Sequence, residues 1–361
     1  MKKKILFASR DLSLGGMEKA LVSLLDSLDY DRYDVTLVLE RAEGALLPKI
    51  DSRVRIKEYR VCDVKAVPVR RAINLLHRLR FMITDGNRYD FSCTYATYSD
   101  PCRVVSLTSS KNSMLYVHSD YVSALGDVGA REFFGTVHAA DYSSVAFVSD
   151  GAREAAERVF PEICGKCVTV GNIPDTDGVR ALAKEKTDDI PKRQGEAVFC
   201  FVGRLDDSSK KLDRLTDALS ILKREGRSPE VWTVGDGPDG ERYKRHANEA
   251  GVSDMMRFFG ARENPYPYMA ASDCLVLCSD FEGFPVVYGE AAALSLPVVT
   301  TVPVSDGTFT VDDSCAYIAK KTPEGVACAM RRFMDDADKK VPFADTEKMK
   351  LETLRRLDGI M

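Results

Sequence analysis

The amino-acid sequence predicts an α/β protein built from two doubly wound, Rossmann-like domains. Short, fully apolar segments, such as residues 5–8, 197–202 and 274–278, alternate with segments in which leucine recurs at helical spacing. Fully apolar strands are typical of a parallel sheet that helices cover on both faces. The length of 361 residues suits two or three domains of ordinary size. We therefore expect two such domains.

The composition excludes several classes of protein. Hydrophobic residues make up 45% of the chain, and the net charge of −4 argues against a surface that coats nucleic acid. Residues 1–8 resemble the start of a signal peptide, but their apolar run is too short for one, and no stretch is long enough to span a membrane. Ten cysteines, several inside apolar strands, suit a reducing compartment. We therefore expect a cytoplasmic protein without a nucleic-acid partner.

Residues 1–176 are predicted to form the first domain. A strand at residues 5–8 leads through Gly15-Gly16 into a helix that ends near residue 28, and a helix start after a glycine turn can hold a phosphate. The two glycines are not the three-glycine dinucleotide fingerprint, and by themselves they are better explained by a tight turn. Further strands are predicted at residues 35–39, 54–59, 92–96, 114–118, 145–148 and 168–170.

Residues 67–83 are predicted to form a basic helix. Arg70, Arg71, Arg78 and Arg80 are interspersed with apolar residues, and the segment contains no acidic residue. Such a helix can lie on an anionic membrane surface. It can equally be a surface helix whose apolar stripe is buried on its own domain, and the sequence leaves both interpretations open.

Three other features of the first half could carry chemistry. His118 follows an apolar strand, at the end where parallel sheets bind ligands. Cys164 and Cys167 have the spacing of a zinc or redox pair, but no second pair follows at ribbon spacing. Asp175 and Asp177 form a D-x-D pattern, but in a hinge-like segment and not after a buried strand. We predict a site role for His118 and neither a metal nor a disulfide at the other two.

The second half is predicted to begin with a linker at residues 177–196. The second domain then covers residues 197–340, and residues 341–361 are predicted to contain a terminal helix.

The first loop of the second domain has the composition of a phosphate site. Gly203 and Arg204 follow the strand at residues 197–202, and Lys210-Lys211 end the loop. Glycine frees the backbone, arginine can hold oxygens in pairs, and lysine acts as a point charge. A solvated loop is the alternative explanation.

Residues 264–301 are the most informative part of the sequence. The buried strand at residues 274–278 is followed by a loop with Glu282 and by a helix with Glu290 on its second turn. We expect Pro285 in the first turn of that helix, where its missing N–H costs nothing. A helix start at the edge of a parallel sheet favours anions, and two carboxylates there can bind the hydroxyl groups of a sugar and a ribose.

The pattern EGFPVVYGE at residues 282–290, preceded by NPYPYM at residues 264–269, resembles the donor-site signature of GT4-type retaining glycosyltransferases with the GT-B fold. The chain is most similar to members that build bacterial capsular polysaccharide, exopolysaccharide or lipopolysaccharide. The similarity covers nearly the whole chain and is strongest over residues 199–301. After residue 301 the chain departs from the family, since it lacks the usual glycine-rich return.

The resemblance implies that the two domains face each other across a cleft, that the first binds the acceptor and the second the nucleotide-sugar, and that the helix of residues 341–361 crosses back to the first domain. It also implies a role for each residue of the signature. Glu282 would contact the transferred sugar, and Glu290 would bind the ribose of the nucleotide. The backbone that holds the sugar and the diphosphate would come from Gly283, Phe284, Pro285, Val286 and Val287.

The resemblance also assigns roles outside the signature. Gly203, Arg204 and Lys210 would neutralise the donor diphosphate, with Lys211 as the alternative to Lys210 because the loop is one residue longer than usual. In the first domain, Gly16 would face the diphosphate and His118 would lie near the transferred sugar. The surface that contacts the membrane or the acceptor would carry Arg70, Arg71, Arg78 and Arg80.

The function that the resemblance implies is hexosyl transfer with retention of configuration. The donor is expected to be a UDP-sugar, and the acceptor a glycan or a polyprenyl-linked saccharide at the inner face of the cell membrane. No cofactor and no metal are expected, because cationic side chains and helix starts would stabilise the leaving diphosphate. Two alternatives share the fold: a UDP-sugar 2-epimerase, which needs no acceptor, and a catalytically silent binding subunit.

Overall fold

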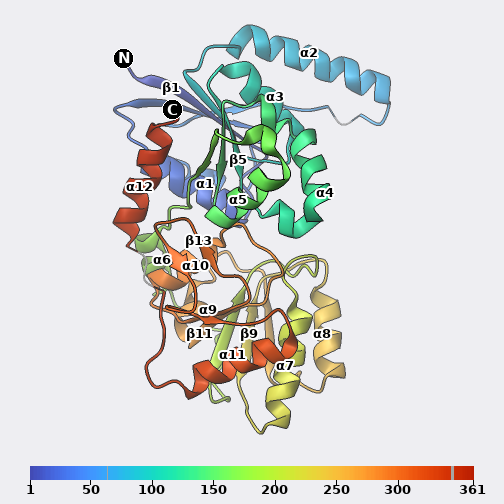
Figure 1. Cartoon of the computed structure of the whole chain (residues 1–361), viewed down its shortest axis with the longest axis vertical. Coiled ribbons are helices and arrows are strands. Elements are labelled where there is room, and N and C mark those ends of the chain that lie inside the picture. Colours follow the sequence, from blue (N-terminus) through green and yellow to red (C-terminus); the bar gives the residue numbers. More distant parts are fainter. Residues whose placement is uncertain (63, 343–344) are drawn as a thin grey trace. The chain divides into compact units, whose positions relative to one another are not determined.

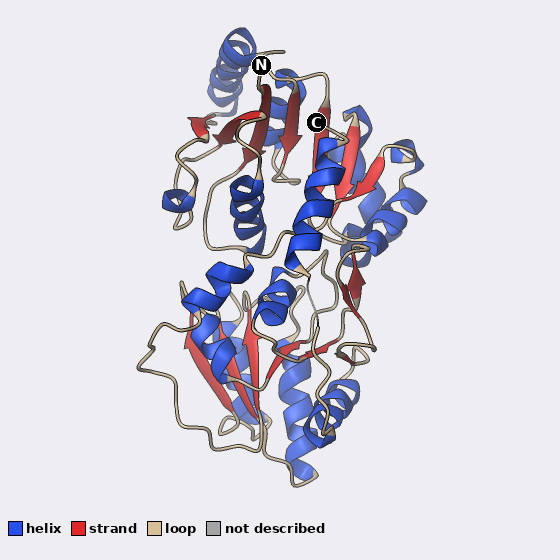
Figure 2. Cartoon of the chain, turned by 90° about the vertical axis from the view of Figure 1, so that its left-hand side faces the viewer, coloured by secondary structure: helices blue, strands red, loops and turns tan. Residues whose placement is uncertain are grey.

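The computed structural model describes residues 1–62, 64–342 and 345–361. The chain divides into two compact units, the first made of Met1–Ile173 and Glu347–Met361 and the second of Pro174–Thr346. Each unit has a central parallel sheet with helices on both faces (Figure 1; Figure 2). The predicted α/β class with two Rossmann-like sheets is confirmed.

The first unit is built on a parallel sheet of seven described strands in the order β3-β2-β1-β4-β5-β6-β7. Ile5, Leu6 and Phe7 of β1 are fully buried, as a strand covered on both faces requires. The strand order reverses between β1 and β4, and open α/β sheets bind ligands at the carboxyl ends of strands beside such a point. The strands are β1 (Lys3–Ser9), β2 (Tyr33–Leu39), β3 (Arg55–Glu58), β4 (Phe91–Thr94), β5 (Ser113–Val117), β6 (Ser144–Phe147) and β7 (Cys167–Thr169).

The helices of the first unit pack through apolar faces of helical period. In α1 the predicted leucines Leu21, Leu24 and Leu25 are buried. The helices are α1 (Gly16–Ser27), α2 (Val67–Asp85), α3 (Asp100–Ser109), α4 (Tyr121–Thr136), α5 (Asp150–Val159) and α12 (Thr346–Asp358), with 3-10 turns at Leu47–Lys49, Ala139–Asp141 and Pro161–Ile163.

Helix α12 completes the first unit although it follows the second unit in sequence. Leu357 is fully buried, and the Asn112 side chain donates to the carbonyl of Ile360 at 2.7 Å. Arg32 and Asp358 form an ion pair at 2.6 Å. The first unit is therefore assembled from both ends of the described chain.

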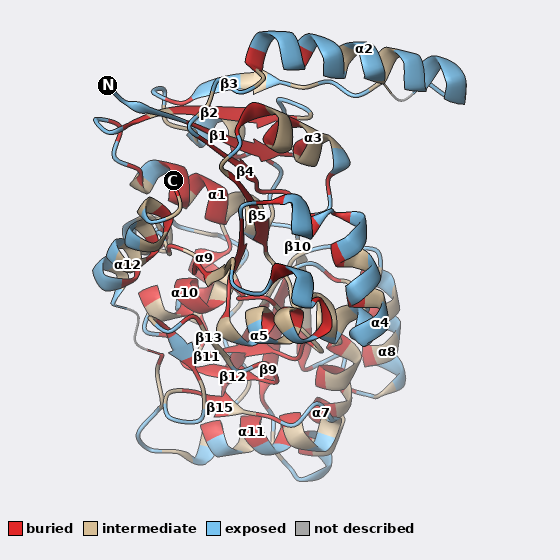
Figure 3. Cartoon of the chain, turned by 45° about the horizontal axis from the view of Figure 1, so that its top comes forward, coloured by how far each residue is buried: buried red, intermediate tan, exposed pale blue. Residues whose placement is uncertain are grey.

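Helix α2 exposes most of its length (Figure 3). Only Phe81 and Asp85 are buried, and Phe81 packs edge-on against Tyr59 with ring centroids 5.3 Å apart. The large apolar side chains that the helix leaves exposed are Val67, Val69, Leu75, Leu76, Leu79, Met82 and Ile83. Of the two interpretations of this basic segment, a buried stripe therefore holds only in part, because Phe81 is buried and Ile73 partly buried while the other large apolar side chains are exposed.

The second unit has a parallel sheet of six described strands in the order β10-β9-β8-β11-β12-β15. Cys200 in β8 and Cys274 in β11 are fully buried and pack as small apolar residues. The strands are β8 (Val198–Val202), β9 (Glu230–Val234), β10 (Met256–Gly260), β11 (Cys274–Leu277), β12 (Val298–Thr300), β15 (Tyr317–Ile318) and the separate antiparallel pair β13 (Val304–Ser305) and β14 (Thr310–Val311). The helices are α6 (Thr176–Leu182), α7 (Leu212–Arg224), α8 (Gly240–Glu249), α9 (Tyr266–Ala271), α10 (Val286–Ala293) and α11 (Pro323–Asp335).

Two local predictions differ from the structure. The expected linker starts with a helix, α6, whose Arg180 donates to the carbonyl of Ala293 at 2.9 Å within the second unit. Asp175 caps α6 by accepting from Gly178 N at 2.9 Å, which explains this carboxylate of the D-x-D pattern. Pro285 precedes α10 and does not lie in its first turn, because its ψ of 120° is extended.

Candidate active site

The loop after β11 carries Glu282, the residue predicted to contact the transferred sugar. Its side chain is 15% exposed, and Oε1 accepts from Ser279 Oγ at 2.6 Å and lies 2.5 Å from Lys210 Nζ. The loop is tied to the end of β12, since the Thr301 hydroxyl donates to the carbonyl of Ser279 at 2.6 Å. The structure thus brings two predicted site residues together at the carboxyl edge of the sheet.

Glu290 lies on α10 and is held by a tyrosine. It is 5% exposed, and the hydroxyl of Tyr266 donates to its Oε1 at 2.9 Å. Burial and the charge of Glu290 raise the pKa of Tyr266, so this phenol stays protonated and keeps donating. Gly289 permits the close packing of α10, because a Cβ there would lie 2.8 Å from Cβ of Pro174. Because Tyr266 lies in the NPYPYM segment, this segment helps to set the orientation of the Glu290 carboxylate.

The predicted backbone cradle forms the entry to α10. Gly283, Phe284 and Pro285 are buried, and Val286 and Val287 are partly exposed at the first turn. Pro285, the residue that precedes this helix, makes no side-chain hydrogen bond that caps it. Free N–H groups and the helix dipole make such a start attractive to an anion.

The loop after β8 packs backbone to backbone on the loop after β9. Leu205 N donates to the carbonyl of Asp236 at 3.0 Å. A Cβ on Gly235 would lie 1.9 Å from the carbonyl oxygen of Gly203, and one on Gly237 would lie 2.3 Å from that of Leu205. The two glycines of the GDGP turn are therefore required where they stand, and they fix the path of the predicted phosphate loop.

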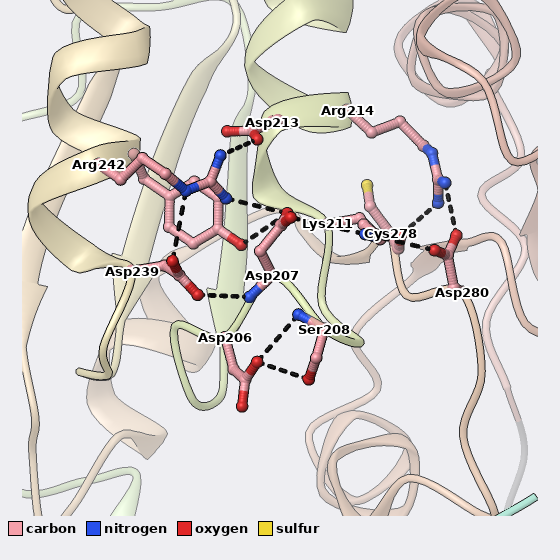
Figure 4. Close-up of polar contacts among 11 residues, drawn as sticks. Asp206, Asp207, Ser208, Lys211, Asp213, Arg214, Asp239, Arg242, Cys278 and Asp280 are labelled. Atoms are coloured by element: carbon pink, nitrogen blue, oxygen red, sulfur yellow. Dashed lines mark hydrogen bonds and ion pairs between the residues drawn. The ribbon is translucent and has the colours of Figure 1, made fainter. Parts of the chain in front are cut away.

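Lys211 belongs to a separate charged network (Figure 4). Its Nζ lies 3.5 Å from Asp207 and 3.7 Å from Asp280, and Arg214 forms an ion pair with Asp280 at 2.5 Å. These contacts pin the end of the loop to α7 and to the segment after β11. Of the two lysines, Lys210 is thus the one that contacts Glu282.

Arg204 is not brought to this pair. Its side chain is 70% exposed, and its Nε lies 3.8 Å from Asp206. The guanidinium keeps most of its donors available to a ligand. Gly203 lies at the end of β8, where its N–H donates to the carbonyl of Val234 at 3.1 Å.

In the first unit, the Gly15-Gly16 turn opens α1 as predicted. The carboxylate of Glu18 lies over this turn, since a Cβ on Gly15 would be 2.1 Å from Glu18 Oε2. Burial raises the pKa of Glu18. A side chain of the helix itself therefore takes the place expected for a phosphate near Gly16, and a bound anion has to displace it.

His118 follows β5 and lies between two aromatic rings. Its ring centroid is 4.3 Å from that of Tyr95 and 4.5 Å from that of Tyr116. Burial lowers its pKa to about 3, and its ring bonds the backbone of Tyr95. Nε2 is buried without a hydrogen-bond partner in the described part of the chain. A neutral imidazole of this kind can accept a hydrogen bond from a hydroxyl, but it does not suit proton transfer near pH 7.

The remaining chemical motifs hold no metal cluster. Cys164 and Cys167 are free thiols. Among residues 1–62, 64–342 and 345–361, no group of three or more His, Cys, Asp or Glu side chains is arranged to hold a metal ion. Of the helices that these residues form, none is both long and apolar enough to cross a bilayer.

Sequence reasoning missed three contributors to the site. Tyr266 belongs to the NPYPYM motif, which the sequence analysis singled out, but the motif alone does not predict the hydrogen bond from Tyr266 to Glu290. Ser279 precedes the loop glutamate and gave no signal. The β13–β14 hairpin comes from the segment that departs from the family, and its Phe309 packs against Phe284 with ring centroids 5.8 Å apart. Such a contact between distant segments leaves no local sequence pattern.

Comparisons with known proteins show what the chain is similar to. Residues 196–336 match the family described as Glycosyl transferases group 1. The chain is 30% identical over 115 residues to a lipopolysaccharide 1,6-galactosyltransferase of Salmonella typhimurium, which covers 31% of this chain and 32% of that protein. It is 29% identical over 114 residues to the lipopolysaccharide core biosynthesis glycosyltransferase LpsD of Rhizobium meliloti, covering 31% and 33%. Each match therefore spans about a third of the relative.

Solved structures match over nearly the whole chain. HepE of Anabaena, crystallised with UDP and glucose, has a TM-score of 0.72 at 18% identity and covers 99% of this chain and 100% of its own. TarM of S. aureus, in a mutant form bound to UDP, has a TM-score of 0.75 at 12% identity and covers 99% of both chains. The protein has the GT-B fold. Its residues 196–336 are similar to the group 1 glycosyltransferase family.

Proposed function

We propose that the protein is a retaining glycosyltransferase that moves a hexose from a UDP-sugar to a glycan or lipid-linked acceptor in surface polysaccharide synthesis. The observation that carries the proposal is the contact of Glu282 with Lys210 at 2.5 Å, beside the helix start that precedes Glu290. A carboxylate for sugar hydroxyls and a cation for phosphate oxygens thus meet at one point. The named relatives and the UDP complexes of HepE support a UDP-sugar.

The proposed transfer uses these groups as follows. The bond between the anomeric carbon and the β-phosphate oxygen breaks, and the acceptor hydroxyl oxygen bonds to the same face of that carbon. The hydroxyl proton passes to the departing phosphate oxygen. Lys210, Arg204 and the start of α10 stabilise the charge that develops on the diphosphate, which is the work a divalent cation does in other transferases. Independence of metal is part of the proposal.

A donor-binding experiment tests the site. Glu290→Ala and Glu282→Ala proteins are compared with the unchanged protein by thermal shift against UDP-glucose, UDP-galactose, GDP-mannose and ADP-glucose. We expect a UDP-sugar to raise the Tm of the unchanged protein and to have less effect on either variant. Equal shifts in folded variants would show that the site assignment is wrong.

A second experiment separates transfer from 2-epimerisation. UDP release is measured with and without lipid-linked saccharides extracted from bacterial membranes, and with and without EDTA. Transfer predicts release that depends on the extract and persists in EDTA. Sugar epimerised without the extract would favour the alternative enzyme.

We further propose that α2 binds an anionic membrane at its inner face. At about 100° per residue, Leu75, Leu79 and Ile83 share one exposed arc of the helix. Arg71 and Arg78 border that arc on one side, and Arg80 borders it on the other, all of them exposed. An apolar face flanked by cations is what an interfacial helix needs.

Vesicle sedimentation tests the membrane contact. The variant in which Arg70, Arg71, Arg78 and Arg80 become glutamate should lose binding to vesicles of phosphatidylglycerol and phosphatidylcholine. A matched control changes four exposed cations of the second unit, Lys192, Arg224, Lys244 and Arg245, to glutamate. Equal binding of the two variants would contradict the proposal.

A further inference from the structure

The first unit contains a cavity that none of the groups above explains. It has a volume of about 760 Å³. Its walls come from the carboxyl ends of four neighbouring strands, with Arg10 after β1, Glu40 after β2, Glu58 at the end of β3 and Tyr98 after β4. This is the edge at which open α/β sheets bind ligands.

The charges around the cavity nearly cancel. Three arginines and four acidic residues line it. Arg60 Nε lies 2.8 Å from Glu58 Oε2, and Arg41 lies 3.4 Å from Glu43 Oε1. Alternating carboxylates and guanidinium groups suit hydroxyl groups, which both donate and accept, and they give no net attraction for a phosphate.

The carboxylates are held in place by their surroundings. The hydroxyl of Ser99 donates to Glu40 Oε1, and Ser99 in turn caps α3 by accepting from Cys102 N at 3.0 Å. Ala42 N donates to Glu58 Oε1 at 3.4 Å. Acceptors fixed in this way cost little ordering free energy when a ligand binds.

Tyr98 supplies an apolar surface. Its side chain is 50% exposed, it lines the cavity, and it hydrogen-bonds Arg10. A half-exposed aromatic ring beside fixed polar groups can pack against the C–H face of a pyranose ring.

The far wall of the cavity is joined to α2. His77 Nδ1 donates to the carbonyl of Arg60 at 2.7 Å, and Asn74 Oδ1 accepts from Cys62 N at 2.7 Å. The cavity therefore adjoins the helix for which we propose membrane contact.

We propose that this cavity binds an uncharged monosaccharide unit of the acceptor, with its ring on Tyr98 and its hydroxyls on Glu40, Glu58 and the arginines between them. The inference rests on the proposed transferase function, because it deepens the acceptor half of that function. It assigns selection of a neutral acceptor sugar to four loops of the first unit.

Saturation-transfer NMR on the full chain tests the inference without a donor. The probes are the methyl glycosides of glucose, galactose and mannose, with glucuronate and glucose 1-phosphate as anionic probes. We expect signal from at least one neutral glycoside, at least a fivefold loss of that signal in Tyr98→Ala, and recovery in Tyr98→Phe, which keeps the ring. Glu58→Gln should also weaken the signal, since it removes a charged acceptor.

The outcomes separate this inference from the proposed function. Three results would each overturn the cavity assignment. They are absence of signal from every neutral glycoside, equal signal in Tyr98→Ala and the unchanged protein, and a preference for the anionic probes. UDP binding is measured on the same samples by calorimetry. UDP binding without a Tyr98-dependent signal refutes the cavity assignment alone, whereas the reverse result refutes the donor site alone.

Discussion

At the scale of single residues, the contact between Tyr266 and Glu290 links stability to donor binding. Tyr266→Phe removes a donor from a carboxylate that is 5% exposed, so the free energy of unfolding should fall by about 1–3 kcal/mol. The affinity for UDP should fall as well, because the Glu290 carboxylate, which we propose binds the ribose, is no longer held. Denaturant titration and calorimetry measure the two effects.

The same helix offers the control for this prediction. Tyr268 bonds Asp189 at 2.6 Å and has no contact with Glu290 among the described interactions. Tyr268→Phe should leave UDP affinity unchanged, and an equal loss in both variants would contradict the role of Tyr266.

Lys210 and Lys211 are adjacent in the chain, so their alanine variants can be compared as a matched pair. Lys210→Ala should lower kcat about 100-fold or more, because the cation that we propose stabilises the leaving diphosphate is lost. Lys211→Ala should have a much smaller effect, since Lys211 is paired with Asp207 and Asp280. Steady-state kinetics with the preferred donor measures both. A larger loss in Lys211→Ala would reverse the assignment.

His118 predicts a dependence of stability on pH. Its pKa is about 3 in the folded chain and close to 6.5 in the unfolded chain, so the unfolded chain binds more protons between these values. Its contribution to stability is complete above pH 6.5 and is lost as pH falls toward 3. Between pH 7 and pH 5 the unchanged protein should lose up to about 2 kcal/mol more than His118→Gln. Denaturant titrations at the two pH values measure this, and equal losses would show that His118 is not buried as a neutral ring.

At the scale of elements, the GDGP turn is the feature that positions the phosphate loop. Gly235 has a φ of +148°, and a Cβ there would meet the carbonyl oxygen of Gly203. Gly235→Ala should lower the unfolding free energy by about 2 kcal/mol or more and weaken UDP binding. Gly151→Ala, in open space on α5, should be neutral or slightly stabilising. Thermal denaturation compares them, and similar losses would contradict the argument.

The elements also show what the sequence could reveal. Apolar runs such as those of β1 and β11 mark buried strands by themselves, so both sheets could be predicted. The motif that runs from Glu282 to Glu290 could also be predicted, because all its residues lie in one short stretch of the sequence. The exposure of α2 could not, because an apolar stripe has the same spacing whether it meets a sheet or solvent. The carboxylate of Glu18 over its own helix start was equally hidden, since it depends on side-chain conformation.

At the scale of the whole molecule, the first unit depends on α12. Residues 174–346 should give a cooperative thermal transition when expressed alone, because they contain the whole second unit. Residues 1–173 alone should lack a cooperative transition, since without α12 the surface against which Leu357 packs is exposed to solvent. Adding a synthetic peptide of residues 345–361 should restore it. A stable first fragment without the peptide would contradict this dependence.

The position of α12 has a consequence for synthesis on the ribosome. The first unit, which we expect to receive the acceptor, emerges before the second but stays incomplete until α12 has been made, because this helix is encoded after the entire second unit. During that interval its uncovered apolar surface needs protection from aggregation, which is the service that chaperones provide. A stop codon between the second unit and α12 would thus damage the unit that was made before it.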